Sequence, residues 1–180
     1  WADNAFTDII ADRFDAGVRL GEHVAKDMIA VRIGPDLRVA IVGTSSYFAK
    51  HGRPESPHHL TQHRCINIRQ QSKGGLYVWE FEKDGHVLNV RVEGPLVLND
   101  STVVLKAVEA GHGVACVMED MSKQAISDGR LVRVLEDWCP PFPGYHLYYP
   151  GRSQQSSAFS LLVEALRDRA PVKRKRRARA

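Results

Sequence analysis

The pattern of apolar and polar positions is clearest between residues 91 and 118, where a strand, a polar break, a helix and a second strand follow one another. Residues 95–98 form an extended apolar run, and after the break at 99–102 the apolar residues recur at helical spacing. Gly111 stands where a left-handed turn ends a helix, and residues 114–118 are again apolar and extended. We predict a right-handed crossover unit of a parallel sheet, whose helix is capped at the carboxyl end of a strand.

The rest of the chain alternates between short extended runs and turns. Residues 37–42 form a nearly continuous apolar run, which is typical of a strand buried on both faces. The pair Asp84-Gly85 between two alternating runs predicts a β-hairpin, so the sheet is mixed. A last helix, capped by Ser156 or Ser157, repeats its apolar residues at i, i+3, i+4 and i+7. The other predicted strands are 15–20, 28–33, 65–69, 78–82, 87–90, 131–135 and 145–149, and the other predicted helices are 6–13 and 122–127, with Glu119 and Asp120 in a strand end and a turn.

Two clusters of small polar residues follow predicted strands. In open α/β sheets, ligands bind beyond the carboxyl ends of the strands, where the N-terminus of a helix can hold an anionic or carbonyl group. The alternative for the second cluster is that it is only an N-cap. The candidate ligand-binding residues are Thr44, Ser45 and Ser46 in the first cluster and Asn99, Asp100, Ser101 and Thr102 in the second.

Length and charge fit a folded chain with a basic end. The chain has 180 residues, 43% of them hydrophobic, which suits one ordinary domain or two small lobes. Six of the 25 basic residues lie in 171–180, which leaves 19 basic against 21 acidic residues in the body. We therefore predict a basic, disordered tail at 170–180 and no nucleic-acid-binding face on the fold. The three cysteines are an odd number without C-x-x-C spacing, which favours a reducing cytoplasm.

No segment carries the pattern of a catalytic or metal site. Residues 43–47 approach the G-x-S-x-G elbow, but Tyr47 replaces the final glycine that its tight turn requires. His59 and His63 are four residues apart without the acidic residue of a zinc helix between them. Residues 111–113 follow a helix, whereas a dinucleotide fingerprint opens one. We expect no catalytic residue, no metal, no cofactor and no enzyme activity.

The chain resembles the effector-binding domain of a LysR-type transcriptional regulator from about Phe6 to Arg167. The resemblance implies a periplasmic-binding-protein-like α/β fold with mixed sheets and two lobes, with an effector in the cleft between them. The segments that carry it are FDAGVRLG (14–21), RVAIVGTSSYF (38–48), LTQHRCI (60–66), WEF (79–81), residues 99–113, GRLV (129–132) and YHLYYP (145–150).

The resemblance also implies a division of the chain into lobes. The first lobe comprises 1–43 and 138–169, and the second comprises 44–137. Arg19 and Leu20, at the end of a first-lobe strand, approach the ligand from the side opposite the two hydroxyl clusters. The first lobe is expected to be incomplete, because the chain opens at what resembles the second strand of that lobe.

In such a regulator, a small organic, anionic effector favours one arrangement of the lobes by binding that arrangement more tightly. The resemblance implies a homo-oligomer, either dimer or tetramer, in the cytoplasm and without membrane contact. DNA is bound only through an N-terminal helix-turn-helix, which is absent from these residues. The alternative is a free-standing solute-binding protein of the same fold.

Overall fold

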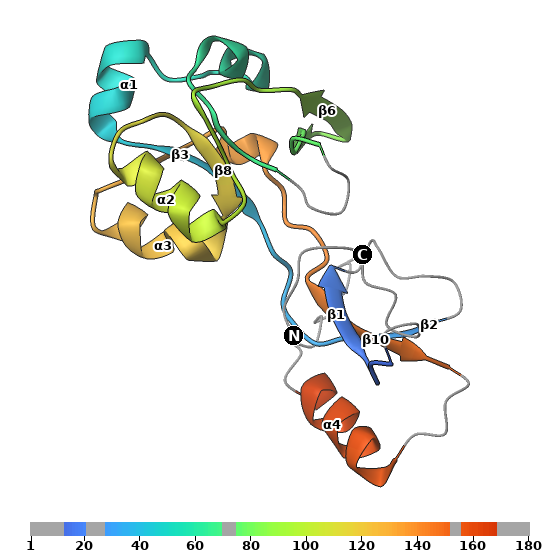
Figure 1. Ribbon diagram of the computed structural model, residues 1–180. Helices are drawn as coiled ribbons and strands as arrows, with labels where there is room; N and C mark the ends of the chain where they lie inside the picture. The colour runs from blue at the N-terminus through green and yellow to red at the C-terminus, as the bar shows by residue number, and fades with distance from the viewer. Residues whose placement is uncertain (1–12, 21–27, 70–74, 152–155, 169–180) are drawn as a thin grey trace, which may run out of the picture. The chain divides into compact units, whose positions relative to one another are not determined.

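The computed structural model describes residues 13–20, 28–69, 75–151 and 156–168, and these form two compact units (Figure 1). The larger unit is Arg38–Pro141, and the smaller one contains the described residues among 7–37 and 142–180. The helix predicted at 6–13 and the tail at 170–180 lie outside the described residues, apart from Arg13. Among the described residues, no helix is both long and apolar enough to cross a membrane.

In the larger unit, β3 (Val39–Gly43) lies between β8 (Ala115–Met118) and β9 (Val132–Val134), and both neighbours are antiparallel to it. β4 (Ile66–Ile68) pairs in parallel with β7 (Leu96–Leu98). A parallel bridge from Cys65 to Val114 connects β4 to β8. The predicted crossover unit is therefore present, with β4 between its two strands.

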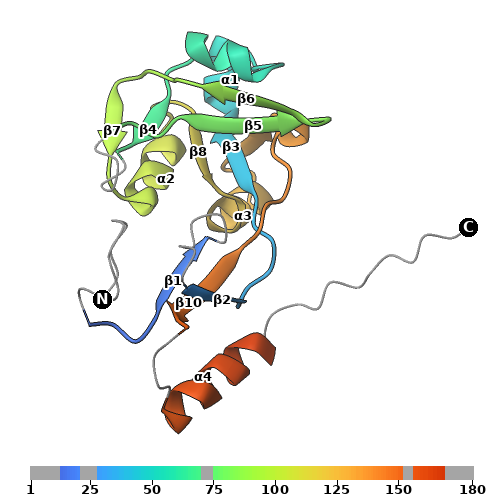
Figure 2. The ribbon, with the colours of Figure 1, turned by 90° about the vertical axis from the view of Figure 1, so that its right-hand side faces the viewer.

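The two faces of this sheet are covered by different elements. Ala40 and Val42 face α2 (Ser101–Glu109) and α3 (Glu119–Ser127), whereas Ile41 belongs to the cluster on the other side. The cluster that contains Ile41 is formed with residues of α1 (Ser45–His51) and of the 3₁₀ helices η2 (Pro57–Gln62) and η3 (Glu136–Trp138). The hairpin of β5 (Trp79–Lys83) and β6 (His86–Val90) completes it. Figure 2 shows this hairpin. Burial on both faces explains the continuous apolar run of β3.

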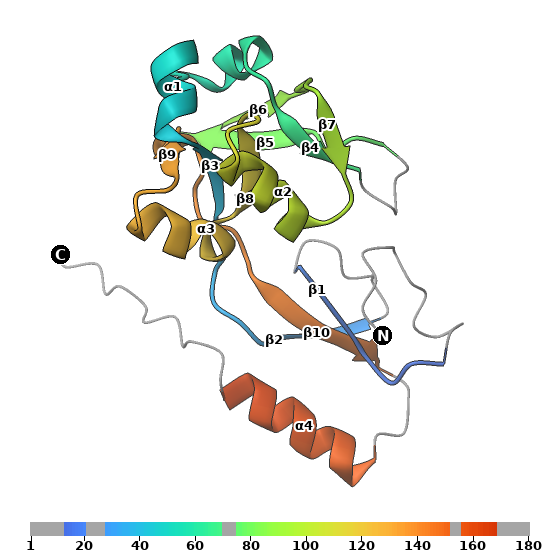
Figure 3. The same ribbon diagram turned by 60° about the vertical axis from the view of Figure 1, so that its left-hand side comes forward.

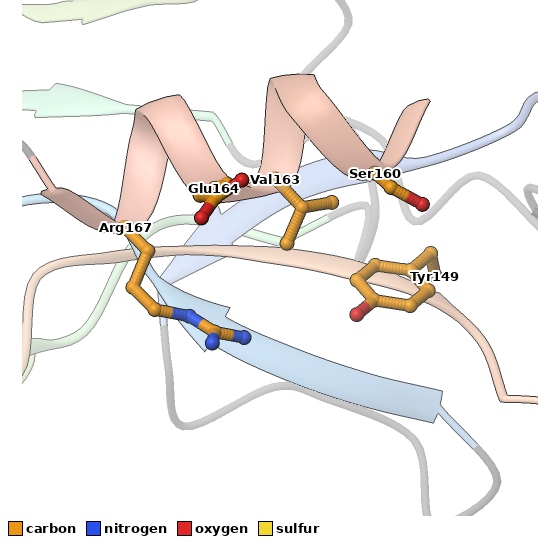
Figure 4. A pocket seen from close by; sticks show the side chains of 5 residues that line it. All are labelled: Tyr149, Ser160, Val163, Glu164 and Arg167. Atoms are coloured by element: carbon orange, nitrogen blue, oxygen red, sulfur yellow. The ribbon is translucent and has the colours of Figure 1, made fainter. Parts of the chain in front are cut away.

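The smaller unit has an antiparallel sheet in the order β1 (Gly17–Leu20), β10 (Tyr145–Pro150), β2 (Met28–Arg32). The helix α4 (Ser157–Asp168) packs on it through Val163, which shares a core with Leu147 and Tyr149. The N–H of Phe159 donates to Ser156 Oγ at 3.2 Å, so Ser156 caps α4 as predicted. An open pocket along α4 is lined by Tyr149, Ser160, Val163, Glu164 and Arg167 (Figure 4).

One expectation requires correction. Glu119 and Asp120 were expected in a strand end and a turn, but they form the first turn of α3, where their carboxylates suit the helix dipole. The lobe boundaries stay a prediction: the compact units divide after Leu37 and before Phe142, whereas the prediction divides the lobes after residue 43 and before residue 138.

Candidate functional site

The N-terminus of α2 lies at the edge of the larger sheet where β7 ends. Asp100 caps the helix, because its Oδ1 accepts the N–H of Thr102 at 2.7 Å and of Val103 at 3.0 Å. Those two N–H groups hold the pKa of Asp100 below its ordinary value, so the carboxylate stays charged. Asn99 and Thr102 are exposed, and Ser101 is half-buried. The cluster therefore is an N-cap and also presents polar groups to solvent.

The same cap limits what the end of α2 can bind. Two donors that an anionic ligand needs are already taken by Asp100, and the charge of Asp100 repels an anion. Arg69 supplies positive charge at this edge, since it directly follows β4, and its N–H donates to Leu98 O at 2.8 Å. The sequence interpretation missed Arg69, although a basic residue directly after a buried strand is the signal that could have identified it.

The first hydroxyl cluster caps α1. Thr44 Oγ1 accepts the N–H of Tyr47 at 3.2 Å and lies 3.1 Å from Ser46 Oγ. Thr44 itself is buried, whereas Ser45 and Ser46 are exposed. A methyl group added at Gly111, which follows α2, would lie 3.8 Å from Thr44 Oγ1. The cluster at Thr44 therefore lies beside the C-terminal end of α2.

The expectation that both hydroxyl clusters lie on the same side of one ligand is wrong. β3 runs antiparallel to β8, whereas β7 and β8 are both parallel to β4, so β3 and β7 end at opposite edges of the sheet (Figure 3). The nine residues of α2 separate the two ends by about 13 Å. A single small ligand held at Ser101 is thus out of reach of Ser45.

Arg19 and Leu20 lie in the smaller unit, at the end of β1, opposite His146 and Tyr145 of β10. The guanidinium carbon of Arg19 is 5.1 Å from the centre of the Tyr148 ring, which suits a cation–π contact. This contact holds the Arg19 side chain against the sheet of its own unit. Both residues remain predicted ligand contacts.

His51 and His63 form an aromatic cluster with Tyr47 at α1 in the larger unit. Tyr47 Oη lies 3.3 Å from His63 Nδ1 and accepts the N–H of Arg64 at 2.9 Å, while the Tyr47 ring stacks on His51. Burial, and then the charges of His51 and His59, lower the pKa of His63. Among the described residues, no three histidine, cysteine or acidic side chains are arranged to hold a metal ion.

The cysteines have the environment of structural residues. Cys65 and Cys139 are buried and Cys116 is half-buried, and none of the three forms a disulfide. Burial raises the pKa of all three thiols, that of Cys139 to about 11 and that of Cys65 to about 12. These thiols are therefore protonated at neutral pH and lack the environment of a nucleophile.

Two compact α/β units, between which the described part of the chain passes after Leu37 and before Phe142, define the class as periplasmic-binding-protein-like, and comparisons with known proteins identify the family. A model of the LysR substrate binding domain matches residues 2–171, so the chain belongs to that family. A putative transcriptional regulator of Pseudomonas aeruginosa is 55% identical over 166 residues, which are 92% of this chain and 54% of that protein. The HTH-type transcriptional regulator PgrR of Escherichia coli is 43% identical over 170 residues, which are 94% of this chain and 57% of that protein.

Solved structures agree on the fold. The full-length virulence activator AphB of Vibrio cholerae, a member of the LTTR family, matches with a TM-score of 0.76 at 22% identity. The match covers 93% of this chain and 56% of that one. The chain spans about half the length of the curated relatives it matches.

Proposed function

We propose that this chain is the effector-sensing part of a LysR-type transcriptional regulator in the cytoplasm, and that it binds a small organic molecule without enzymatic turnover. The observation that carries the proposal is the family match over 2–171. The polar edge where β4 and β7 end supports it, because ligands of α/β sheets bind beyond strand ends. DNA binding belongs to a helix-turn-helix outside these residues, and association with a second copy is expected from the resemblance.

In this proposal the ligand contacts Ser101 and Thr102 at the N-terminus of α2, and Arg19 and Leu20 stay predicted contacts. An anionic group of the ligand pairs with Arg69 rather than with the helix N-terminus, which Asp100 already occupies. A ligand that binds one arrangement of the chain more tightly than another favours that arrangement, and this preference is the signal.

A thermal-shift screen with organic acids, amino acids and aromatic acids tests the proposal. A compound present at about 100 times its Kd stabilises the chain by about 2.7 kcal/mol, which raises Tm by roughly 5–10 °C. Ser101→Ala removes one hydrogen-bonding hydroxyl and should weaken the best compound about fivefold to tenfold.

The matched control is Ser45→Ala, because Ser45 is the corresponding first residue of α1 at the opposite edge. This variant should bind like the wild type. Weaker binding by Ser45→Ala with unchanged binding by Ser101→Ala would contradict the proposed site. Chemical conversion of a compound in the screen would contradict the proposed class and point to an enzyme.

A further inference from the structure

Among the residues that the structure describes, the chain passes between its two compact units after Leu37 and again before Phe142. These two residues exchange backbone hydrogen bonds of 2.9 and 2.8 Å, so the two passages run side by side. Any change in the arrangement of the units must involve both passages together. How they are joined on the larger unit's side therefore determines where the chain can bend.

Arg38 joins them there. Its Nε donates to Cys139 O at 2.9 Å, and its Nη2 donates to Glu136 O at 3.2 Å. The carbonyl of Glu136 lies at the start of η3 and that of Cys139 directly after it, in the second passage, whereas Arg38 begins the larger unit in the first. A planar guanidinium can donate to two fixed acceptors at once, which an ammonium group cannot do with the same geometry.

Charged neighbours hold the Arg38 side chain in this position. Its Nη1 is 3.7 Å from a carboxylate oxygen of Glu136 and 4.0 Å from one of Glu119. Arg133 bonds to Glu119 as well, and its Nη2 donates to Val39 O at 3.1 Å. Two arginines and two glutamates thus form a network without net charge around the start of β3, in which Arg133 is mostly buried and Glu136 is exposed.

The η3 segment is held from its other side too. Lys83, at the tip of the hairpin, pairs with Asp137 and lies 5.5 Å from the centre of the Trp138 ring. η3 begins after Leu135, which is buried and has a φ of 54°, a left-handed conformation that side chains other than glycine rarely adopt. Such a conformation persists only where surrounding contacts fix it, and Arg38 supplies two of them.

We propose that Arg38 is a positioning residue that joins the two passages into one hinge, so that the units can change their arrangement only by bending both passages together beyond Leu37 and Phe142. This role rests on the proposed sensor function, because it makes the domain respond to its effector with one coordinated movement. Without Arg38, each passage would bend by itself, and the arrangement of the units would be loosely defined.

Spin labels on the two units measure this directly. Cysteines introduced at the exposed positions Lys123 in α3 and Leu161 in α4 can be labelled selectively, since the native thiols are buried or half-buried. The label-to-label distance distribution in the 180-residue chain should broaden in Arg38→Gln. It should broaden in Arg38→Lys too, because lysine keeps the charge but loses the paired donors.

Arg130→Gln is the matched control. Arg130 also pairs with two carboxylates of the larger unit, those of Glu109 and Asp128, but it lies away from the passages. It should leave the distribution as narrow as in the wild type. Amide exchange at Trp138 and Cys139, whose N–H groups donate to Leu135 O and Glu136 O, should accelerate on the order of tenfold in Arg38→Lys and stay unchanged in Arg130→Gln.

A distribution in Arg38→Lys as narrow as in Arg130→Gln would overturn the proposal, and so would unchanged exchange at η3. Should Arg38→Gln fail to fold, the lysine variant still decides between these outcomes. Neither measurement requires an effector. A failed ligand screen therefore does not contradict this inference. An Arg38 variant with a narrow distance distribution does not contradict the proposed sensor function.

Discussion

Asn67 is a buried polar residue in β4, and its side chain joins β4 to the β5–β6 hairpin by hydrogen bonds. Its Nδ2 donates to Tyr77 O at 2.9 Å, and its Oδ1 accepts the indole N–H of Trp79 at 3.2 Å and the N–H of Ile68 at 2.8 Å. Asn67 is 3% exposed and Trp79 is 1% exposed, so water cannot replace these bonds without local opening. Asn67→Leu keeps the approximate size of the side chain and removes all three.

The cost follows from the number of bonds and their burial. Three hydrogen bonds at about 1 kcal/mol each give about 3 kcal/mol, and unpaired buried partners add to this loss. The apolar leucine side chain offsets part of it, which leaves a loss of about 2–3 kcal/mol. For a chain of this size, such a loss lowers Tm by roughly 5–10 °C.

Thermal unfolding followed by far-UV circular dichroism measures this loss without depending on the fluorescence of Trp79. Asn89→Leu is the control, because Asn89 is an exposed asparagine in the same hairpin. It should change Tm by less than about 2 °C, as expected for surface substitutions. If Asn67→Leu destabilised the chain no more than Asn89→Leu, the reasoning on the buried network would be refuted.

Two further predictions concern pH and backbone contact. The lowered pKa of His63 means that the unfolded chain binds a proton more readily than the folded one, so the free energy of unfolding should fall as pH drops below about 6.5. Denaturant titrations across this range check the loss, and His63→Gln should show a smaller one; an equal loss would contradict the assignment. Gly113→Ala should abolish or strongly reduce folding, because the new Cβ would lie 2.0 Å from the backbone oxygen of Arg64. Gly34→Ala is the control with ordinary contacts of 3.8 Å, and equal yields of folded protein for both variants would contradict that expectation.

Elements with local signals could be predicted from the sequence. The Asp84-Gly85 pair does form the turn between β5 and β6, and both residues have positive φ as their types allow. α2 begins after Asp100, which belongs to the polar cluster expected to cap it, and is followed by Gly111 with a φ of 80°. The family and its fold are likewise confirmed, because the order of these segments is itself specific.

The positions of the two hydroxyl clusters at opposite edges of the sheet could not be predicted, because the direction in which two distant strands pair is not encoded locally. Thr44 and Ser101 look alike in the sequence, and both follow apolar strands. Only the antiparallel ladder between β3 and β8 separates them. The hydrogen bonds of Arg38 to Glu136 and Cys139 span about a hundred residues. They could not be predicted either, because a local sequence pattern does not show which distant residues meet.

The most direct test of the account maps where a ligand binds. Amide chemical shifts of the isotopically labelled chain should be recorded with and without the strongest compound from the thermal screen. The account predicts the largest shifts at Asn99 to Thr102 and at Arg69, with Thr44 to Ser46 unchanged. Shifts confined to Thr44 to Ser46, or to the open pocket along α4, would contradict it.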